Sequence, residues 1–536
     1  YQEQYLTGGN QYSASANEGN SKGRSVNSSL MGEWKVDKST RVNFSGNFGY
    51  TPNQNESNSQ SASFDAPPGV NHENLFSDFE SVPRDIKVNR SENRSRSENE
   101  SHRYHWAMGV MRRLNEKGTT LGLNIQNSDS WGNNESFSLS ETTYFRLKDK
   151  NGNDSVLYRN QYLKSPQRNN SWRVGLSFTQ PVGKKVRLRV AYNWSTRYER
   201  SNRDTYELSS LASSDIYGEL PSGYEAGYVD SLSNRSHSRS NGHDLNVGVN
   251  YSDDTWMFNA SLGVTPQRRT IDRKVGKLYA DTAMNMIDFQ PMIWMSWRKK
   301  EMRVSLNYNG NTRQPSLSDL MPLTDNSNPL YITRGNPDLK QMFSHNIRLN
   351  FQNSPKGISA NLGGQVEQNS VTQVMIYDVQ TGGRETYPVN INGNWNLSGG
   401  ASWWKRFGHF SLRLDMSGNH SNRVGMINED KSLQPEKSTT RDTGLNCEAQ
   451  ASYQPSWGGI DLSTSWNYQY SLNSLNDNDT YTRYYNFGLN GYVDFPFGLQ
   501  LRTDATYNLR SGTNIQKGED DEILWNACLL YTSDAA

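Results

Sequence analysis

Residues 409–419 read HFSLRLDMSGN, and apolar and polar side chains alternate along most of this stretch. The apolar positions are Phe410, Leu412, Leu414 and Met416. The residues between them are Ser411, Arg413 and Asp415. Successive side chains of a β-strand point to opposite faces of a sheet. The stretch therefore predicts a strand with one apolar face and one face that carries full charges.

The composition of the chain excludes several kinds of protein. Only 33% of the 536 residues are hydrophobic but 11% are aromatic, whereas disordered chains are poor in aromatic residues. The net charge of +1 gives no reason to expect a nucleic-acid partner. Cys447 and Cys528 lie far apart and have no neighbours with metal-ligand spacing, so we expect no metal and no cofactor. No apolar run approaches the roughly 18 residues of a membrane helix.

The same alternation recurs along the whole chain. It is clearest in VRLRVAYNW (186–194) and DLNVGVNY (244–251). Six further segments show it: 120–126, 172–178, 302–308, 345–351, 461–470 and 499–508. Strict alternation over such lengths indicates strands, and no amphipathic helix is recognisable.

The connections between these strands alternate in length. Nine short ones join strands into hairpins: 36–40, 115–118, 181–185, 252–255, 298–301, 353–357, 405–408, 455–459 and 495–498. Long polar segments separate the hairpins: 51–103, 127–171, 197–242 and 310–344. With partial strands at both ends, the chain contains roughly 20 strands, which is near the number found in wide barrels.

Three architectures contain many alternating strands. A sandwich rarely needs so many, and a propeller or solenoid has a fixed repeat length that this chain lacks. A transmembrane barrel has alternating segments of about ten residues, short turns on one side, long loops on the other and aromatic girdles. Trp256 and Trp297 beside the short turns, and Tyr50 and Tyr308 at the start of the long segments, match such girdles.

We therefore predict an all-β fold. It is a large antiparallel transmembrane β-barrel with short periplasmic turns and long extracellular loops, in which roughly 20 of about 22 strands are visible. The location predicted is the outer membrane of a Gram-negative bacterium.

A loop in the second half of the chain carries a family resemblance. Residues 315–343 read PSLSDLMPLTDNSNPLYITRGNPDLKQMF, in which Asn-Pro pairs predict turns before the strand HNIRLNF. The segment resembles the GNP-x-L-x-P-E signature of TonB-dependent outer-membrane receptors, although Gln341 and Met342 replace the usual Pro-Glu. Residues 176–194, LSFTQPVGKKVRLRVAYNW, are also similar to a segment of the outer membrane protein beta-barrel family. The resemblance covers most of the chain, but only the barrel part of such receptors.

The resemblance implies ligand import. External loops and a plug capture a ligand, and the TonB complex of the inner membrane pulls on the plug to open a path. This chain would supply the wall, the loops and the lumen lining. The ligand class stays open between iron chelates, oligosaccharides and peptides. The expected partners are outer-membrane lipid and lipopolysaccharide, the protein's own plug domain, the TonB complex and a surface lipoprotein.

Residues 1–536 are expected to form one barrel domain that is incomplete at both ends. The amino-terminal plug and the TonB-contacting segment have no counterpart in the chain. The strand that ends at Trp34 needs an upstream neighbour, and the last residues, TSDAA, fit no strand.

Candidate site residues fall into two groups. The first consists of arginines on predicted lumen faces, which would contact an anionic ligand or the plug, with a solvated inner wall as the simpler interpretation: Arg187, Arg189, Arg348 and Arg413. The second is the family loop motif, which is interpreted as pinning a long loop to the rim: Asn328, Pro329, Gly335, Asn336, Pro337, Asp338 and Leu339. His102 and His105 would point to opposite faces of a strand, which makes them poor co-ligands of a metal.

The rival functions are a passive or export pore and a surface adhesin or assembly barrel. No Ser-His-Asp, Cys-His or paired-carboxylate arrangement rises above chance, so the chain is not expected to be an enzyme.

Overall fold

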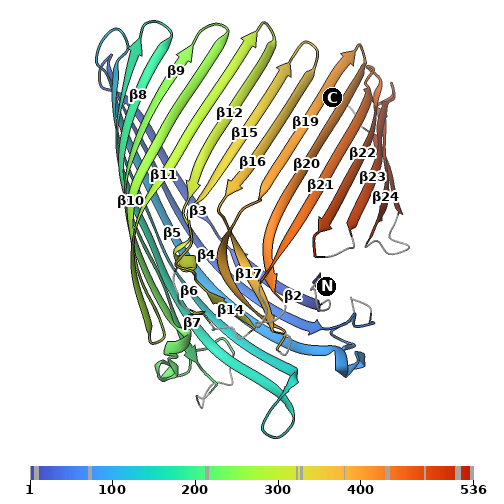
Figure 1. The fold of residues 1–536 in the computed structure, drawn as a ribbon. Coiled ribbons are helices and arrows are strands. Elements are labelled where there is room, and N and C mark those ends of the chain that lie inside the picture. The colour runs from blue at the N-terminus through green and yellow to red at the C-terminus, as the bar shows by residue number, and fades with distance from the viewer. Residues whose placement is uncertain are drawn as a thin grey trace.

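The computed structural model describes residues 2–4, 11–70, 75–209, 211, 217–320, 324–325, 330–378, 381–428, 435–475, 479–513 and 521–531. These residues form one sheet of 25 strand segments, drawn in Figure 1. The helical elements are short: α1 (Leu317–Leu320), η2 (Phe79–Ser81), η3 (Arg84–Ile86), η4 (Tyr224–Gly227) and η5 (Asp230–Leu232). Over the described part of the chain, no helix has the length and apolar character needed to cross a membrane.

Antiparallel pairing joins successive strands into one curved wall (Figure 1). Its first strands are β3 (Val26–Lys35), β4 (Thr40–Phe64), β5 (Lys87–Arg113), β6 (Thr120–Lys148), β7 (Asp154–Val182), β8 (Val186–Glu207), β9 (Asn234–Ser252), β10 (Trp256–Val275), β11 (Leu278–Lys299) and β12 (Met302–Arg313). The wall continues through β15 (Met342–Asn353), β16 (Ile358–Gln368), β19 (Trp395–Phe407), β20 (Phe410–Asn428), β21 (Glu436–Tyr453), β22 (Gly458–Asn473), β23 (Thr480–Asp494), β24 (Leu499–Gly512) and β25 (Asp521–Tyr531). β2 (Gln11–Gly23) pairs with the second half of β4 and with the short β1 (Gln2–Gln4).

The nine short connections predicted from the sequence are all hairpin turns, and they lie together at one end of the wall (Figure 1). Polar side chains close several of them. At the turn between β9 and β10, the carboxylate of Asp253 accepts hydrogen bonds from the Tyr251 hydroxyl (2.5 Å), from the N–H groups of Trp256 and Thr255, and from Lys185 (3.2 Å). The Tyr251 hydroxyl and these further donors hold the pKa of Asp253 well below its usual range.

The two faces of the wall differ in polarity as the opening stretch predicts. On β20, Leu414 lies opposite Trp403 and Ala449, whereas Arg413 lies opposite Trp404 and Gln450. The Leu414 face forms a shallow apolar groove that extends from β20 to β25. Large apolar side chains remain exposed on it, including Leu414 at 47% and Met416 at 61%. So much exposed apolar surface is the expected character of a wall that faces lipid.

The long polar segments depart from the prediction, because most of them are strands and not loops. β4 to β7 are 25 to 29 residues long, and β8 has 22. A tilted strand crosses a bilayer in about 9–11 residues, so more than half of each strand in β4 to β7 extends beyond the membrane. The polar alternation is also of period two: on β4 the inner face carries Asn55 and Ser57, and the outer face carries Gln54 and Glu56. The hydroxyls of Ser57 and Ser95 meet across β4 and β5 at 2.8 Å.

A second, smaller set of strands lies inside the curve of the wall (Figure 1). β17 (Ser370–Asp378) and β18 (Gly383–Ile391) form a hairpin, which β14 (Tyr331–Arg334) joins in parallel and which β13 (Thr324–Asp325) extends. β17 also pairs in parallel with the end of β20. At the hairpin tip, the Asn89 side-chain amide of β5 donates to the Thr381 carbonyl at 3.0 Å. The hairpin therefore links parts of the wall that are far apart in strand order.

The all-β class and the antiparallel wall are confirmed. The sheet is nevertheless open: within the described residues, β3 and β25 do not pair, and both are exposed along their whole length. The count of 25 segments exceeds the roughly 20 expected because it includes the short strands inside the curve and strands that lie end to end.

Candidate functional site

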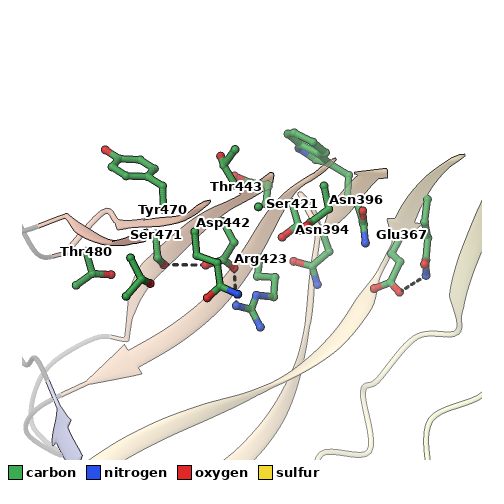
Figure 2. Close-up of a pocket in the computed structure, with 17 residues that line it drawn as sticks. Glu367, Asn394, Asn396, Ser421, Arg423, Asp442, Thr443, Tyr470, Ser471 and Thr480 are labelled. Carbon is green, nitrogen blue, oxygen red and sulfur yellow. Dashed lines mark hydrogen bonds and ion pairs between the residues drawn. The ribbon is translucent and has the colours of Figure 1, made fainter. Parts of the chain in front are cut away.

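The inner face of the wall contains a polar hollow of about 680 Å³ near the far ends of β16 to β23. Its inward-facing lining consists of amides, hydroxyls and a few charges: Gln365, Glu367, Asn396, Asn419, Ser421, Arg423, Asp442, Gln469, Ser471, Thr480 and Thr482. Figure 2 shows Arg423, Asp442 and Ser471 on the side of the hollow, whereas Thr443 and Tyr470 extend from the opposite face of the same strands. The alternation of side chains along each strand therefore determines which residues line the hollow.

The charges of this hollow are paired with their neighbours. Arg423 donates to Asp442 at 2.5 Å, and the Ser471 hydroxyl donates to the same carboxylate at 2.7 Å (Figure 2). Glu367 accepts from Gln365 (2.9 Å) and from Ser370 (2.7 Å). Because Arg423 and Asp442 compensate each other and Glu367 already accepts two hydrogen bonds, what the hollow offers to a ligand is mainly hydrogen bonding from amides and hydroxyls.

A second hollow, also of about 680 Å³, lies on the inner face of β11 to β19. Asparagines supply most of its polar lining: Asn307, Asn309, Asn346, Asn350 and Asn396. Arg348 is the single charged residue in this lining. An uncompensated guanidinium among neutral amides favours an anionic or strongly polar group as its partner.

The four candidate arginines face the same side of the wall but do not form one cluster. Arg187 and Arg189 lie near the turn that opens β8, Arg348 lies on β15, and Arg413 lies on β20. Arg413 is already paired with Asp415 at 2.6 Å. The sequence identified these positions by their charge but missed the asparagines and glutamines around Arg348. The asparagines could have been found from the sequence, because they recur on one face of a strand, as Asn307 and Asn309 do and as Asn346 and Asn350 do.

The family loop motif is bound to β18 and α1. The Asn336 side-chain amide donates to the Pro388 carbonyl (3.0 Å), and its backbone N–H donates to the Asp319 carbonyl (2.5 Å). Lys340 and Asn390 exchange two hydrogen bonds. Leu339 is buried, and Pro337 and Asp338 are exposed. Asn328 and Pro329 lie outside the described residues.

The two histidines are on opposite faces of β5, as strand geometry requires. His102 stacks on Trp131 with ring centroids 5.1 Å apart, on the outer face, whereas His105 lies opposite Asn47 and Ser128 on the inner face. Among the described residues, no group of three or more His, Cys, Asp and Glu is arranged to hold a metal ion.

Comparison with known proteins gives a family and several structural likenesses. No curated protein matches the chain. Among solved structures it is similar to the siderophore receptor PirA from Pseudomonas aeruginosa, at 12% identity and a TM-score of 0.33, over 92% of this chain and 80% of that one. It is similar to the copper transporter OprC at 11% identity and a TM-score of 0.45, over 93% and 74%.

A third likeness is to the alcaligin outer-membrane receptor FauA from Bordetella pertussis, at 10% identity and a TM-score of 0.35, over 97% and 75%. The family assignment comes from the sequence alone, since residues 112–440 match the model of one family over more than half of the chain. With its antiparallel wall and its outward apolar face, the chain belongs to the outer membrane protein beta-barrel family, and its place is the outer membrane of a Gram-negative bacterium.

Proposed function

We propose that this chain is the wall of a TonB-dependent receptor that imports a polar ligand into the periplasm, and that it is not an enzyme. The observation that carries the proposal is the inner face of the wall. It offers hollows lined by amides and hydroxyls, with Arg348 as the charged residue of one of them, while the outer face of the wall is apolar. Such a division suits a lumen through which a hydrated solute passes.

The wall also supplies the means of capture. β4 to β7 continue beyond the membrane, so their inner faces present polar side chains, mainly serine and asparagine, to a ligand before it reaches membrane depth. The hairpin β17–β18 lies inside the curve of the wall and accepts a hydrogen bond from Asn89 of β5. We infer that it narrows the mouth of the lumen. The resemblance of residues 335–339 to the receptor signature is consistent with this function.

In this scheme the wall residues bind and orient the ligand or the plug, and they take no part in a chemical reaction. Arg348 and the surrounding asparagines hold polar groups of the ligand or of the plug. The plug closes the lumen until the TonB complex displaces it. Iron chelates, oligosaccharides and peptides all carry groups that this wall can bind. The partners we propose are the plug domain, the TonB complex and a surface lipoprotein.

A permeability experiment separates the receptor from a passive pore. The complete gene product is reconstituted in liposomes, and entry of a neutral trisaccharide is followed by swelling. In parallel, uptake of a ferric siderophore, a labelled oligosaccharide and a labelled peptide is measured in cells with and without the gene, with and without TonB. We expect no swelling, and uptake of one probe that needs both the gene and TonB. Swelling without energy, or uptake that does not respond to loss of TonB, would overturn the proposal.

A further inference from the structure

The outer face of β8 to β10 has an aromatic border above its apolar band. Val186, Leu188 and Val190 alternate outward along β8, and Trp194 continues the same face. Trp194 lies opposite His243, whose Nδ1 is 2.7 Å from the Tyr192 hydroxyl. Aromatic side chains of this kind gather at the interface between hydrocarbon and head groups.

Arginines occupy the same outer face beyond this border. Arg200, Arg239 and Arg268 are all exposed, and we refer to them as the outer arginine cluster. They come from β8, β9 and β10, three neighbouring strands. Arg239 lies opposite Tyr198 on β8, and Arg200 lies opposite His237 on β9. Three adjacent strands therefore present cationic groups to the same side.

The cluster has no compensating carboxylate. Within the described residues, none of the three arginines forms an ion pair, although nearby Arg168 pairs with Asp129 at 2.9 Å. Arg200 lies directly opposite Arg168, and like charges in opposed positions destabilise a sheet. With the Asn202 amide in its hydrogen-bonding orientation, Arg200 donates to it at 3.1 Å, which leaves its charge uncompensated.

The carboxylate that lies nearest in register does not neutralise the cluster. Asp272 lies opposite His237, and within the described residues it forms no ion pair with the three arginines; its hydrogen bond comes from the Tyr279 hydroxyl at 3.3 Å. An anion that is not part of this chain would remove the repulsion.

The height of the cluster fits one such anion. Arg200 is six residues beyond Trp194, and Arg239 is four residues beyond His243. At about 3.3 Å per residue and a tilt of about 40°, this is roughly 10–15 Å above the aromatic border. Flexible arginine side chains reach back toward the membrane from there. That layer holds the head groups of the outer leaflet, which in an outer membrane is built from a phosphorylated glycolipid.

We propose that the outer arginine cluster is a binding site for the phosphate groups of this glycolipid. Guanidinium forks bind phosphate through paired, charge-assisted hydrogen bonds, and they are weakly hydrated compared with ammonium groups. The bound lipid screens Arg168 from Arg200 and anchors the extended strands at the membrane surface. The site is independent of the ligand that the lumen carries.

The test measures lipid binding by the complete gene product in detergent, with native mass spectrometry. The probes are bisphosphorylated lipid A and the same lipid A without phosphate. We expect the wild type to retain the phosphorylated form preferentially. The variant Arg200→Gln/Arg239→Gln/Arg268→Gln should bind it more weakly, by on the order of tenfold or more, with no change for the phosphate-free form.

The matched control is Arg103→Gln/Arg173→Gln/Arg197→Gln, which removes the same charge from the inner face of β5, β7 and β8. This control should retain phosphorylated lipid A like the wild type. If the triple variant of the cluster does not fold, Arg239→Gln alone is measured in its place. The proposal would be wrong if the wild type retained both lipids equally. It would also be wrong if the inner-face control lost as much phosphorylated lipid A as the cluster variant.

Discussion

Two single substitutions on β20, one on each face, distinguish the lipid-facing side of the wall from the lumen-facing side. Leu414 lies midway between the turn at 408–409 and the outer aromatic pair Trp395–His420, so Leu414→Arg places a cation near the middle of the apolar band. An arginine on the lipid face at mid-depth costs about 2–4 kcal/mol, which is roughly a 30-fold to several-hundred-fold change in the folding equilibrium. Arg413→Leu removes the partner of Asp415, but this ion pair is 59% and 26% exposed, so the expected loss is much smaller than that of Leu414→Arg.

The assay is urea unfolding of the complete gene product in lipid vesicles, read by the heat-modifiable shift in gel mobility. Leu414→Met, which nearly conserves volume, is the control for disturbance of the site and should stay close to the wild type. We expect a clear loss of folded protein for Leu414→Arg and a small one for Arg413→Leu. Equal losses for the two variants would refute the assignment of the faces.

Three further predictions follow from the turns and loops. Cysteines introduced by Ser59→Cys and Arg235→Cys should react with an impermeant maleimide on intact cells, whereas those introduced by Lys184→Cys and Arg406→Cys should not. The reverse pattern would mean that the short turns face the outside of the cell. Asp253→Asn should lower the urea midpoint at neutral pH, because the depressed pKa of Asp253 means that the carboxylate stabilises the fold above the ordinary value of 3.8. That difference should shrink as the pH falls below 3.8, and a difference that stays constant would contradict it. Asn336→Ala should lower the stability of segment 330–341 against local unfolding by about 1–2 kcal/mol, since it removes the hydrogen bond to the Pro388 carbonyl. Faster proteolysis of this segment is the expected result, and an unchanged cleavage rate would exclude that role.

The sequence predicted the hairpins and the faces because both depend on local chemistry. Turns such as 181–185 contain glycine, and Gly183 adopts a φ of +73°, which glycine accepts without strain. The side-chain period of two then assigns each residue of a strand to a face once one residue is known. In this way Arg413 and Leu414 were assigned to opposite faces of their strand, and so were His102 and His105.

The extended strands were harder to predict because much of their alternation is between polar residues. In residues 90–101, serine and asparagine alternate with arginine and glutamate, a pattern that hydrophobic periodicity does not detect. The two-residue turn at Gly276-Lys277, between β10 and β11, was also missed. The β17–β18 hairpin depends on parallel pairing with β14 and β20 and on the contact of Asn89 with Thr381, which are non-local and leave no periodic signal.

The central claim is that one face of the wall meets lipid and the other meets water, and spin labels along β20 test it most directly. With Cys447 and Cys528 replaced by serine, single labels are placed in turn at residues 412 to 416 of the complete gene product in vesicles. Collisions with oxygen report lipid, and collisions with a water-soluble nickel chelate report the lumen. We predict oxygen maxima at Leu412, Leu414 and Met416 and nickel maxima at Arg413 and Asp415. Equal exposure of all five positions to the nickel chelate, or a period other than two, would contradict the account.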